Sequence, residues 1–378
     1  MTDTIPPGLK KHWDKPLREF VTLDPAPVEP ALAERHRIYS LLTLALLAAQ
    51  WNGNKWRTPG NYGAWRTSQL AEGAAADLGY YATGDYQGHN IAALAVDARG
   101  RIIDFDFNHN ELFNSSVEHA ESRLMRRLFS LAQVFESWDD GRGVAEGLGA
   151  TKGRGAKARG TKARGTPEPA FLLAVSAPPD EEAQATGVAA AAAPRRTSYG
   201  KLLTDVTIYT SLESCAQCSG IMTLGDVREV VYMQHDPGQY YIGNMMFQAT
   251  KGGSGARAPH PVPAGGFGFE YFDRLQVAFD DFRDRVRREP FYTDANGRKD
   301  HGGSITSFLC TDLALAITSD AAAELENPRA LREPGYVRPS RDGKPVPGGL
   351  TNEGVLAEAV GFLRYATVQG GRGTAHRA

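Results

Sequence analysis

The chain has 378 residues, long enough to bury a substantial core, and 42% hydrophobic with 23% charged residues is typical of a soluble globular protein. A formal net charge of −2 excludes a molecule that is strongly basic as a whole, so any nucleic-acid-binding surface has to be local. Three cysteines exclude a disulfide framework, and with no apolar N-terminal stretch and no long apolar run they predict a cytoplasmic protein without a membrane span.

The first third of the chain predicts an extended arm followed by a helix, a β-hairpin and a second helix. The arm, at 1–28, is rich in Pro and polar residues, and the first helix is apolar enough to be buried on most sides. The turn Asp97-Ala98-Arg99-Gly100 places Gly where a hairpin needs a positive φ. The predicted helix, two strands and second helix cover residues 29–51, 91–96, 102–107 and 117–135.

Residues 139–203 differ in composition from their surroundings. They are rich in Gly, Ala, Lys and Arg, and such a stretch buries too little apolar surface to offset the entropy of ordering it. We expect a mobile insertion here. Beyond it, strands at 206–209 and 229–233 flank a helix at 215–224, which predicts a β-α-β unit with parallel neighbouring strands.

The rest of the chain predicts helices at 271–288 and 354–366, while 305–317 fits a strand or a helix. Without the insertion, the order of elements predicts a three-layer α/β/α domain with a mixed central sheet. The predicted division is an N-terminal arm (1–28), a first half-domain (29–138), the insertion (139–203), a second half-domain (204–250) and a C-terminal extension of uncertain fold (251–378).

Two short motifs carry the candidate chemistry: His119-Ala120-Glu121 and Cys215-Ala216-Gln217-Cys218. One His and two Cys can hold Zn²⁺ with its fourth position open, and a nearby carboxylate can then handle protons on water. Ser214 is a suitable N-cap for a helix with both cysteines in its first turn, where the helix dipole favours thiolates.

Together these motifs resemble those of the cytidine deaminase-like superfamily of zinc-dependent hydrolytic deaminases. The resemblance covers roughly residues 29–250 without the insertion. It implies that His119, Cys215 and Cys218 are zinc ligands. It further implies that zinc-activated water attacks a ring carbon bearing an amino group, while Glu121 moves the protons.

The same resemblance implies substrate contacts. The segment GRIIDFDFNHN is similar to the family strand that ends in a substrate-binding Asn, which makes Asn108 the first candidate and Asn110 the second. The backbone N–H of Ala120 is a further candidate, and Tyr241 with Asn244 lies where the family closes over its substrate. Ser214 stands where the family usually has Pro, a departure that is harmless to the helix start and is consistent with an unusual subfamily.

Three functions stay open at this point. The first is deamination of a free nucleobase, nucleoside or nucleotide. The second is the same chemistry on a nucleic acid such as tRNA or single-stranded DNA, held by the basic run 152–164 or the aromatic and charged stretch 51–66. The third is a zinc-stabilised binding protein without turnover. The family's common dimers and tetramers leave a homo-oligomer open as well.

Other candidate residues have plainer interpretations. His235 is the alternative fourth ligand that a purely structural zinc site would need. His109 either lines the substrate pocket or is a capping or surface group. Cys310 lies in an apolar stretch and is predicted to be a core residue rather than a ligand.

Overall fold

The computed structural model describes residues 27–51, 88–110, 113, 115–138, 203–239, 241–253, 255–288, 292–293, 299–300 and 303–369. The predicted arm and insertion lie outside these residues, except for 27, 28 and 203. The basic run 152–164 lies outside them too, as does the stretch 51–66 apart from Trp51.

A five-stranded mixed sheet forms the centre of the molecule, in the order β2-β1-β3-β4-β5. β1 pairs antiparallel with both β2 and β3, whereas β3, β4 and β5 run parallel. The strands are β1 (Ala92–Val96), β2 (Ile102–Phe107), β3 (Thr207–Thr210), β4 (Glu229–Tyr232) and β5 (His260–Pro263). The predicted mixed sheet and parallel β-α-β unit are confirmed.

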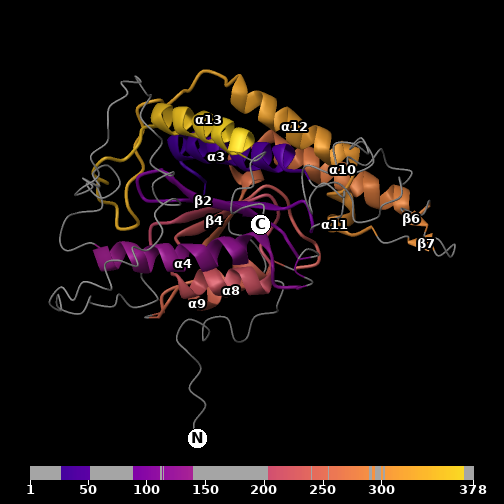
Figure 1. The fold of residues 1–378 in the computed structure, drawn as a ribbon, viewed down its shortest axis with the longest axis horizontal. Coiled ribbons are helices and arrows are strands. Elements are labelled where there is room, and N and C mark those ends of the chain that lie inside the picture. The colour runs from indigo at the N-terminus through magenta and orange to yellow at the C-terminus, as the bar shows by residue number, and fades with distance from the viewer. Residues whose placement is uncertain are drawn as a thin grey trace, which may run out of the picture.

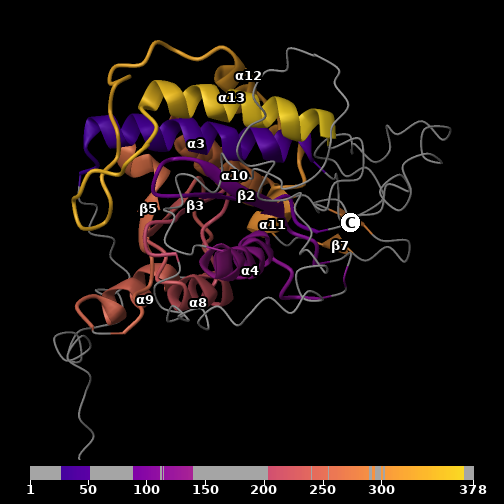
Figure 2. The ribbon, with the colours of Figure 1, turned by 60° about the vertical axis from the view of Figure 1, so that its left-hand side comes forward.

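Helices cover both faces of the sheet (Figure 1). On one face lies α3, against which α12 and α13 pack, and α10 packs against α12; Figure 2 shows α3 and α13 side by side. On the other face lie α4, α8 and α9. The helices are α3 (Pro30–Ala49), α4 (Ala120–Trp138), α8 (Ala216–Leu224), α9 (Ile242–Thr250), α10 (Glu270–Val286), α12 (Asp312–Glu326) and α13 (Asn352–Gln369). This arrangement confirms the predicted three-layer α/β/α class.

Smaller elements complete the described chain: η4 (Ala264–Phe267), α11 (Ile305–Phe308) and the two-stranded ribbon of β6 (Tyr292–Thr293) and β7 (Lys299–Asp300). The ambiguous segment 305–317 is therefore helical. β5 lies beyond residue 250, in the range predicted as the C-terminal extension, and the division of the chain into domains stays a prediction.

The core lies on both faces of the sheet, and α3 is buried over most of its length as its apolar pattern predicts. Leu42, Leu44, Leu94 and Ile208 are fully buried in it. The hairpin between β1 and β2 turns at Gly100, whose φ is 83° as predicted. In the described part of the chain, none of the helices is long and apolar enough to cross a membrane.

Candidate active site

Three potential metal ligands meet on the face of the sheet that α4 and α8 cover, although His119 is 96 residues from the nearer of the two cysteines. His119 directly precedes α4, Cys215 is the N-cap of α8, and Cys218 lies in the first turn of that helix. His119 Nδ1 lies 3.4 Å from Cys215 Sγ and 3.6 Å from Cys218 Sγ. All three ligand atoms lie within 4.8 Å of one another, so one ion can contact them all.

The donor set and its spacing fit zinc. Zn–S bonds of about 2.3 Å and a Zn–N bond of about 2.0–2.1 Å in a tetrahedron place nitrogen and sulfur ligands roughly 3.5 Å apart. The two observed distances lie on either side of that value. Two thiolates and one imidazole leave the fourth corner of the tetrahedron for another group, as in catalytic zinc sites.

The electrostatics of the cysteine pair favours a thiolate. A hydrogen bond from Cys218, helped by another from His119, lowers the pKa of the Cys215 thiol to about 4. The hydrogen bond to Cys215, together with burial, raises the pKa of Cys218 well above its ordinary range, and the hydrogen bond with Cys215 raises the pKa of His119. The two cysteines therefore share one proton between their sulfurs, and a divalent cation bound to both sulfurs would replace that proton.

Glu121 lies beside this cluster, on the first turn of α4, and its side chain is buried at 4% exposure. Its Oε2 lies 3.5 Å from Cys218 Sγ. Its Oε1 accepts hydrogen bonds from Thr210 Oγ1 at 3.2 Å and Ser214 Oγ at 3.1 Å. Burial, followed by the nearby charge of Cys215, raises the pKa of the Glu121 carboxyl, which suits a group that takes up and returns a proton.

The prediction that Ser214 caps α8 is wrong. Cys215 is the N-cap residue, and no side-chain hydrogen bond caps the helix. The Ser214 hydroxyl donates instead to Glu121, across 93 residues of sequence. This contact gives a physical reason for Ser at a position where Pro, which has no donor, stands in the family that the motifs resemble.

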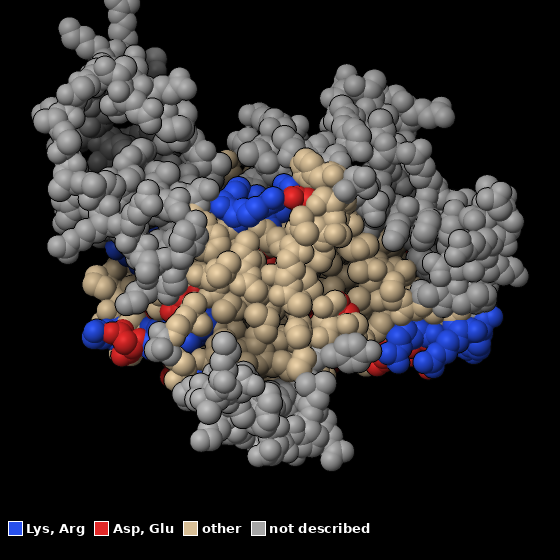
Figure 3. All heavy atoms as spheres, turned by 90° about the horizontal axis from the view of Figure 1, so that it is seen from below, with Lys and Arg blue, Asp and Glu red and all other residues tan. Residues whose placement is uncertain are grey.

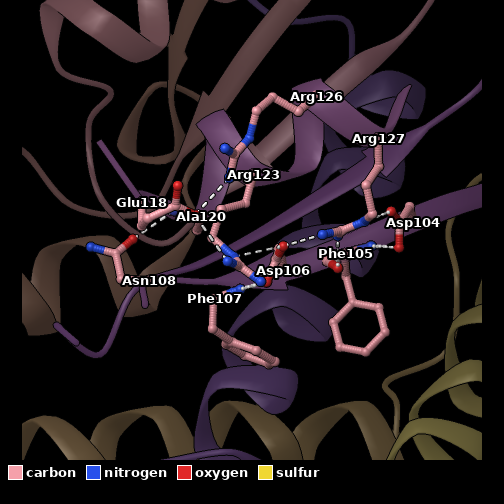
Figure 4. Close-up of polar contacts among 10 residues, drawn as sticks. All are labelled: Asp104, Phe105, Asp106, Phe107, Asn108, Glu118, Ala120, Arg123, Arg126 and Arg127. Carbon is pink, nitrogen blue, oxygen red and sulfur yellow. Dashed lines mark hydrogen bonds and ion pairs between the residues drawn. The ribbon is translucent and has the colours of Figure 1, made fainter. Parts of the chain in front are cut away.

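An ionic network fixes the start of α4 on β2 (Figure 4). Asp106 is fully buried, and its Oδ2 accepts a hydrogen bond from Arg123 Nε at 3.1 Å. Arg123 Nη1 also donates to Glu118 Oε2 at 2.9 Å, which ties down the residue directly before His119. The full network joins Arg123, Arg126 and Arg127 to Asp104, Asp106 and Glu118.

The predicted substrate contacts Asn108 and Ala120 bond to each other. Asn108 Oδ1 accepts the backbone N–H of Ala120 at 2.7 Å, and both residues are buried (Figure 4). Asn110 Oδ1 accepts the backbone N–H of His89 at 3.3 Å instead. Asn108 therefore holds the end of β2 against the start of α4, and contact of these residues with a substrate stays a prediction.

Tyr241 begins α9 in a left-handed conformation with φ 55°, and its ring meets the His235 ring edge-on with centroids 5.1 Å apart. His235 Nδ1 lies 3.2 Å from Glu213 Oε2. Within the described chain, the group able to share one metal ion comprises the three predicted ligands and does not include His235. The pocket roles of Tyr241 and Asn244 stay predictions.

Two further predicted residues are buried. Cys310 is 3% exposed within the hydrophobic core, and its thiol donates to the Thr306 carbonyl, which confirms its predicted core position. His109 is also 3% exposed, and burial lowers its pKa to about 4, so the ring is neutral near pH 7. His109 is therefore neither a surface group nor a charged one.

Sequence reasoning missed the hydroxyl and amide groups around the ligands: Thr210, Ser122 and Gln217. Ser122 Oγ lies 3.5 Å from Cys218 Sγ, and Gln217 Nε2 lies 2.7 Å from Ser122 Oγ. One signal was available, because Ser122 follows His119 by three residues at the start of α4 and Gln217 lies between the two cysteines. The hydrogen-bond partner of each hydroxyl is a residue almost one hundred positions away in the sequence.

The chain matches no known family model, and no curated protein resembles it at a significant level. Among solved structures, one that resembles it comes from work on A-to-I editing by tRNA:A34 deaminases at the wobble position of transfer RNA. It is 16% identical, with 52% of this chain and 96% of that chain covered at a TM-score of 0.23. At that TM-score the likeness carries no conclusion, and the fold class stated above depends on the sheet and helices of this chain.

Proposed function

We propose that this protein is a zinc-dependent hydrolytic deaminase of an amino-bearing nucleobase, nucleoside or nucleotide. The observation that carries the proposal is the meeting of His119, Cys215 and Cys218 within 4.8 Å, with the buried Glu121 carboxylate 3.5 Å from one of these sulfurs. A metal ion with three protein ligands beside a carboxylate is the arrangement of hydrolytic zinc sites.

The chain's own residues have distinct tasks in this proposal. His119 Nδ1 and the two sulfurs hold Zn²⁺, which when bound lowers the pKa of water toward about 7. Glu121 Oε2 accepts the proton of the attacking water and delivers protons to the ring nitrogen and the departing amino group. Ser214 Oγ donates to Oε1 at 3.1 Å, whereas Oε2 is the oxygen that faces the Cys218 sulfur and is assigned the proton transfer. Water adds at the amino-bearing carbon, ammonia departs, and a carbonyl remains.

A small substrate fits the charge of the described surface. Seen from the side of α4, α8 and α9, the described Lys and Arg side chains lie mainly at the margin of an area with few charges (Figure 3). Over the part of the chain that can be described, this face therefore presents no continuous basic surface for a phosphate backbone. A nucleic-acid substrate and zinc binding without turnover are the alternatives that the experiment separates.

The test is a mass-spectrometric screen of zinc-loaded protein against nucleobases, nucleosides, nucleotides, RNA and single-stranded DNA. We expect a gain of about one dalton as an amino group becomes a carbonyl, together with released ammonia. Glu121→Gln should lower this rate by about 10³-fold while zinc content stays that of the wild type. Thr204→Ala, whose half-buried hydroxyl bonds Asp226 away from the ligand cluster, is the control and should keep full activity.

The outcomes discriminate between the three functions. Turnover of oligonucleotides alone, with affinity that falls steeply as salt rises, would replace the small substrate by a polymer. Zinc retention without turnover of any compound would favour a binding protein. Failure of the purified protein to hold zinc would contradict all three.

A further inference from the structure

A short relay of polar groups leads from the surface of α8 to one of the proposed zinc ligands. Gln217 Nε2 lies 3.0 Å from the Val117 carbonyl oxygen and 2.7 Å from Ser122 Oγ. Ser122 Oγ in turn lies 3.5 Å from Cys218 Sγ, a hydrogen-bonding distance for sulfur. The relay joins α4 to α8 at the point where both helices begin.

The direction of each hydrogen bond follows from the groups involved. The Val117 carbonyl only accepts, so the Gln217 side chain faces it with its NH₂ group, and that same nitrogen donates to Ser122 Oγ. The Ser122 hydroxyl has a single hydrogen. Because its oxygen is already accepting from Gln217, that hydrogen is free to point at Cys218 Sγ.

The Cys218 sulfur requires a hydrogen-bond donor when it binds a metal ion. A cysteine that binds a metal has lost its proton and can only accept hydrogen bonds. Cys218 is 0% exposed and Ser122 is 3% exposed, so bulk water is excluded from both. A buried negative charge without a donor is costly, and the Ser122 hydroxyl meets that demand.

We propose that Ser122, oriented by Gln217, is a positioning residue that donates a hydrogen bond to the Cys218 thiolate and thereby tunes this sulfur as a zinc ligand. The inference rests on the zinc centre of the proposed function, and it does not depend on which substrate is deaminated. The hydrogen bond withdraws electron density from the sulfur and fixes its lone pairs, as outer partners of metal ligands do.

The experiment uses the full-length protein loaded with Co²⁺, whose sulfur-to-metal charge-transfer band reports the electron density on the thiolates. Ser122→Ala should shift this band to longer wavelength, since an unbonded thiolate gives up its electron more easily. In a chelator competition with Zn²⁺, the same variant should bind about tenfold more weakly than wild type. Ser122→Thr keeps the hydroxyl and should restore the band.

Ser219→Ala is the matched control. Ser219 neighbours Cys218 on α8, is 1% exposed, and its hydroxyl has no hydrogen-bond partner among the described residues. Like Ser122→Ala, the Ser219→Ala variant loses one buried hydroxyl oxygen. It should leave the Co²⁺ charge-transfer band and the Zn²⁺ affinity unchanged. If wild type binds Co²⁺ but Ser122→Ala behaves as Ser219→Ala does, the role of Ser122 is refuted while the zinc centre stands. If wild type binds neither metal, the proposed function fails with it.

Discussion

Glu121 and Glu229 are both buried carboxylates, 4% and 6% exposed, yet they lie on opposite faces of the sheet and have opposite surroundings. Glu229 starts β4 on the face of α3, where its partners include His36 from that helix. Glu121 starts α4 on the other face (Figure 1). The comparison shows how the surroundings of a buried carboxyl group lower its pKa in one place and raise it in another.

Around Glu229 the fold supplies a cation. Arg338 Nη2 lies 2.5 Å from Glu229 Oε1, and Thr207 Oγ1 donates to the same oxygen at 3.0 Å. Burial opposes ionisation, but the charge of Arg338, followed by that of His36, lowers the pKa of Glu229 to about 2. This carboxylate therefore stays ionised and joins the C-terminal segment to the sheet.

Around Glu121 the described contacts are two hydroxyls and a thiol, with no guanidinium or ammonium group among them. Burial then dominates, and its pKa is raised. A carboxyl group that is hard to ionise and lacks a fixed cation can exchange a proton. Among the described contacts, Glu229 has a guanidinium partner and Glu121 has none.

The largest effect is expected where the cation is removed. Arg338→Met leaves Glu229 buried and unpaired, and should lower the free energy of unfolding by about 3–5 kcal/mol at pH 7. Urea unfolding measures it. The control is Arg287→Met, because Arg287 and its partner Asp284 are 68% and 67% exposed and an exposed pair contributes little. Equal small losses in both variants would refute the importance of the Arg338–Glu229 pair.

A smaller effect is expected at Glu121. Ser214→Ala removes one of two hydroxyl donors from a buried carboxylate and should cost about 1–3 kcal/mol in the metal-free protein. The loss should be greater at pH 8 than at pH 5, because the variant disfavours the ionised form that prevails at high pH. Ser219→Ala, which loses an unpartnered hydroxyl, should cost less. A loss independent of pH would show that Ser214 does not act through the Glu121 carboxylate.

A third effect concerns the pH dependence of the Glu229 cluster. Burial lowers the pKa of His36 to about 3, and His36 Nδ1 lies 2.9 Å from the Tyr209 hydroxyl. Between roughly pH 6.5 and 3, His36 is protonated in the unfolded chain but neutral in the native state. The free energy of unfolding therefore decreases by at most about 1.4 kcal/mol for each unit by which the pH is lowered. His36→Gln should lack this part of the slope when urea unfolding is compared at pH 7 and 4.5. Parallel slopes would contradict the assignment.

The sequence predicted those parts of the fold whose pattern is local. β2 has the predicted bounds Ile102–Phe107, and α3 is buried as its apolar run indicates. β5 was missed because its sequence, His-Pro-Val-Pro, contains two prolines, which have no backbone N–H to donate to a neighbouring strand. The sheet tolerates these prolines because β5 is an edge strand. α9, which directly follows Tyr241, was missed as well.

In the candidate site, too, the sequence predicted the features that depend on a local pattern and missed those that depend on distant residues. The resemblance of the two motifs to those of a known family predicted that His119, Cys215 and Cys218 share one site, and the structure brings the three side chains together. The hydroxyls of Ser214 and Ser122 were not assignable, because their partners Glu121 and Cys218 are 93 and 96 residues away. Which hydroxyl faces which charge is set by how α4 and α8 pack, and a local pattern holds no information on that.

Metal analysis combined with X-ray absorption of the purified protein shows whether His119, Cys215 and Cys218 hold one zinc ion. We expect one zinc per chain with two sulfur ligands. The zinc should be lost in His119→Ala and Cys215→Ser but retained in Cys310→Ser, whose buried thiol lies outside the ligand cluster. A protein that retains no zinc, or one whose zinc falls as far in Cys310→Ser as in Cys215→Ser, would contradict this expectation.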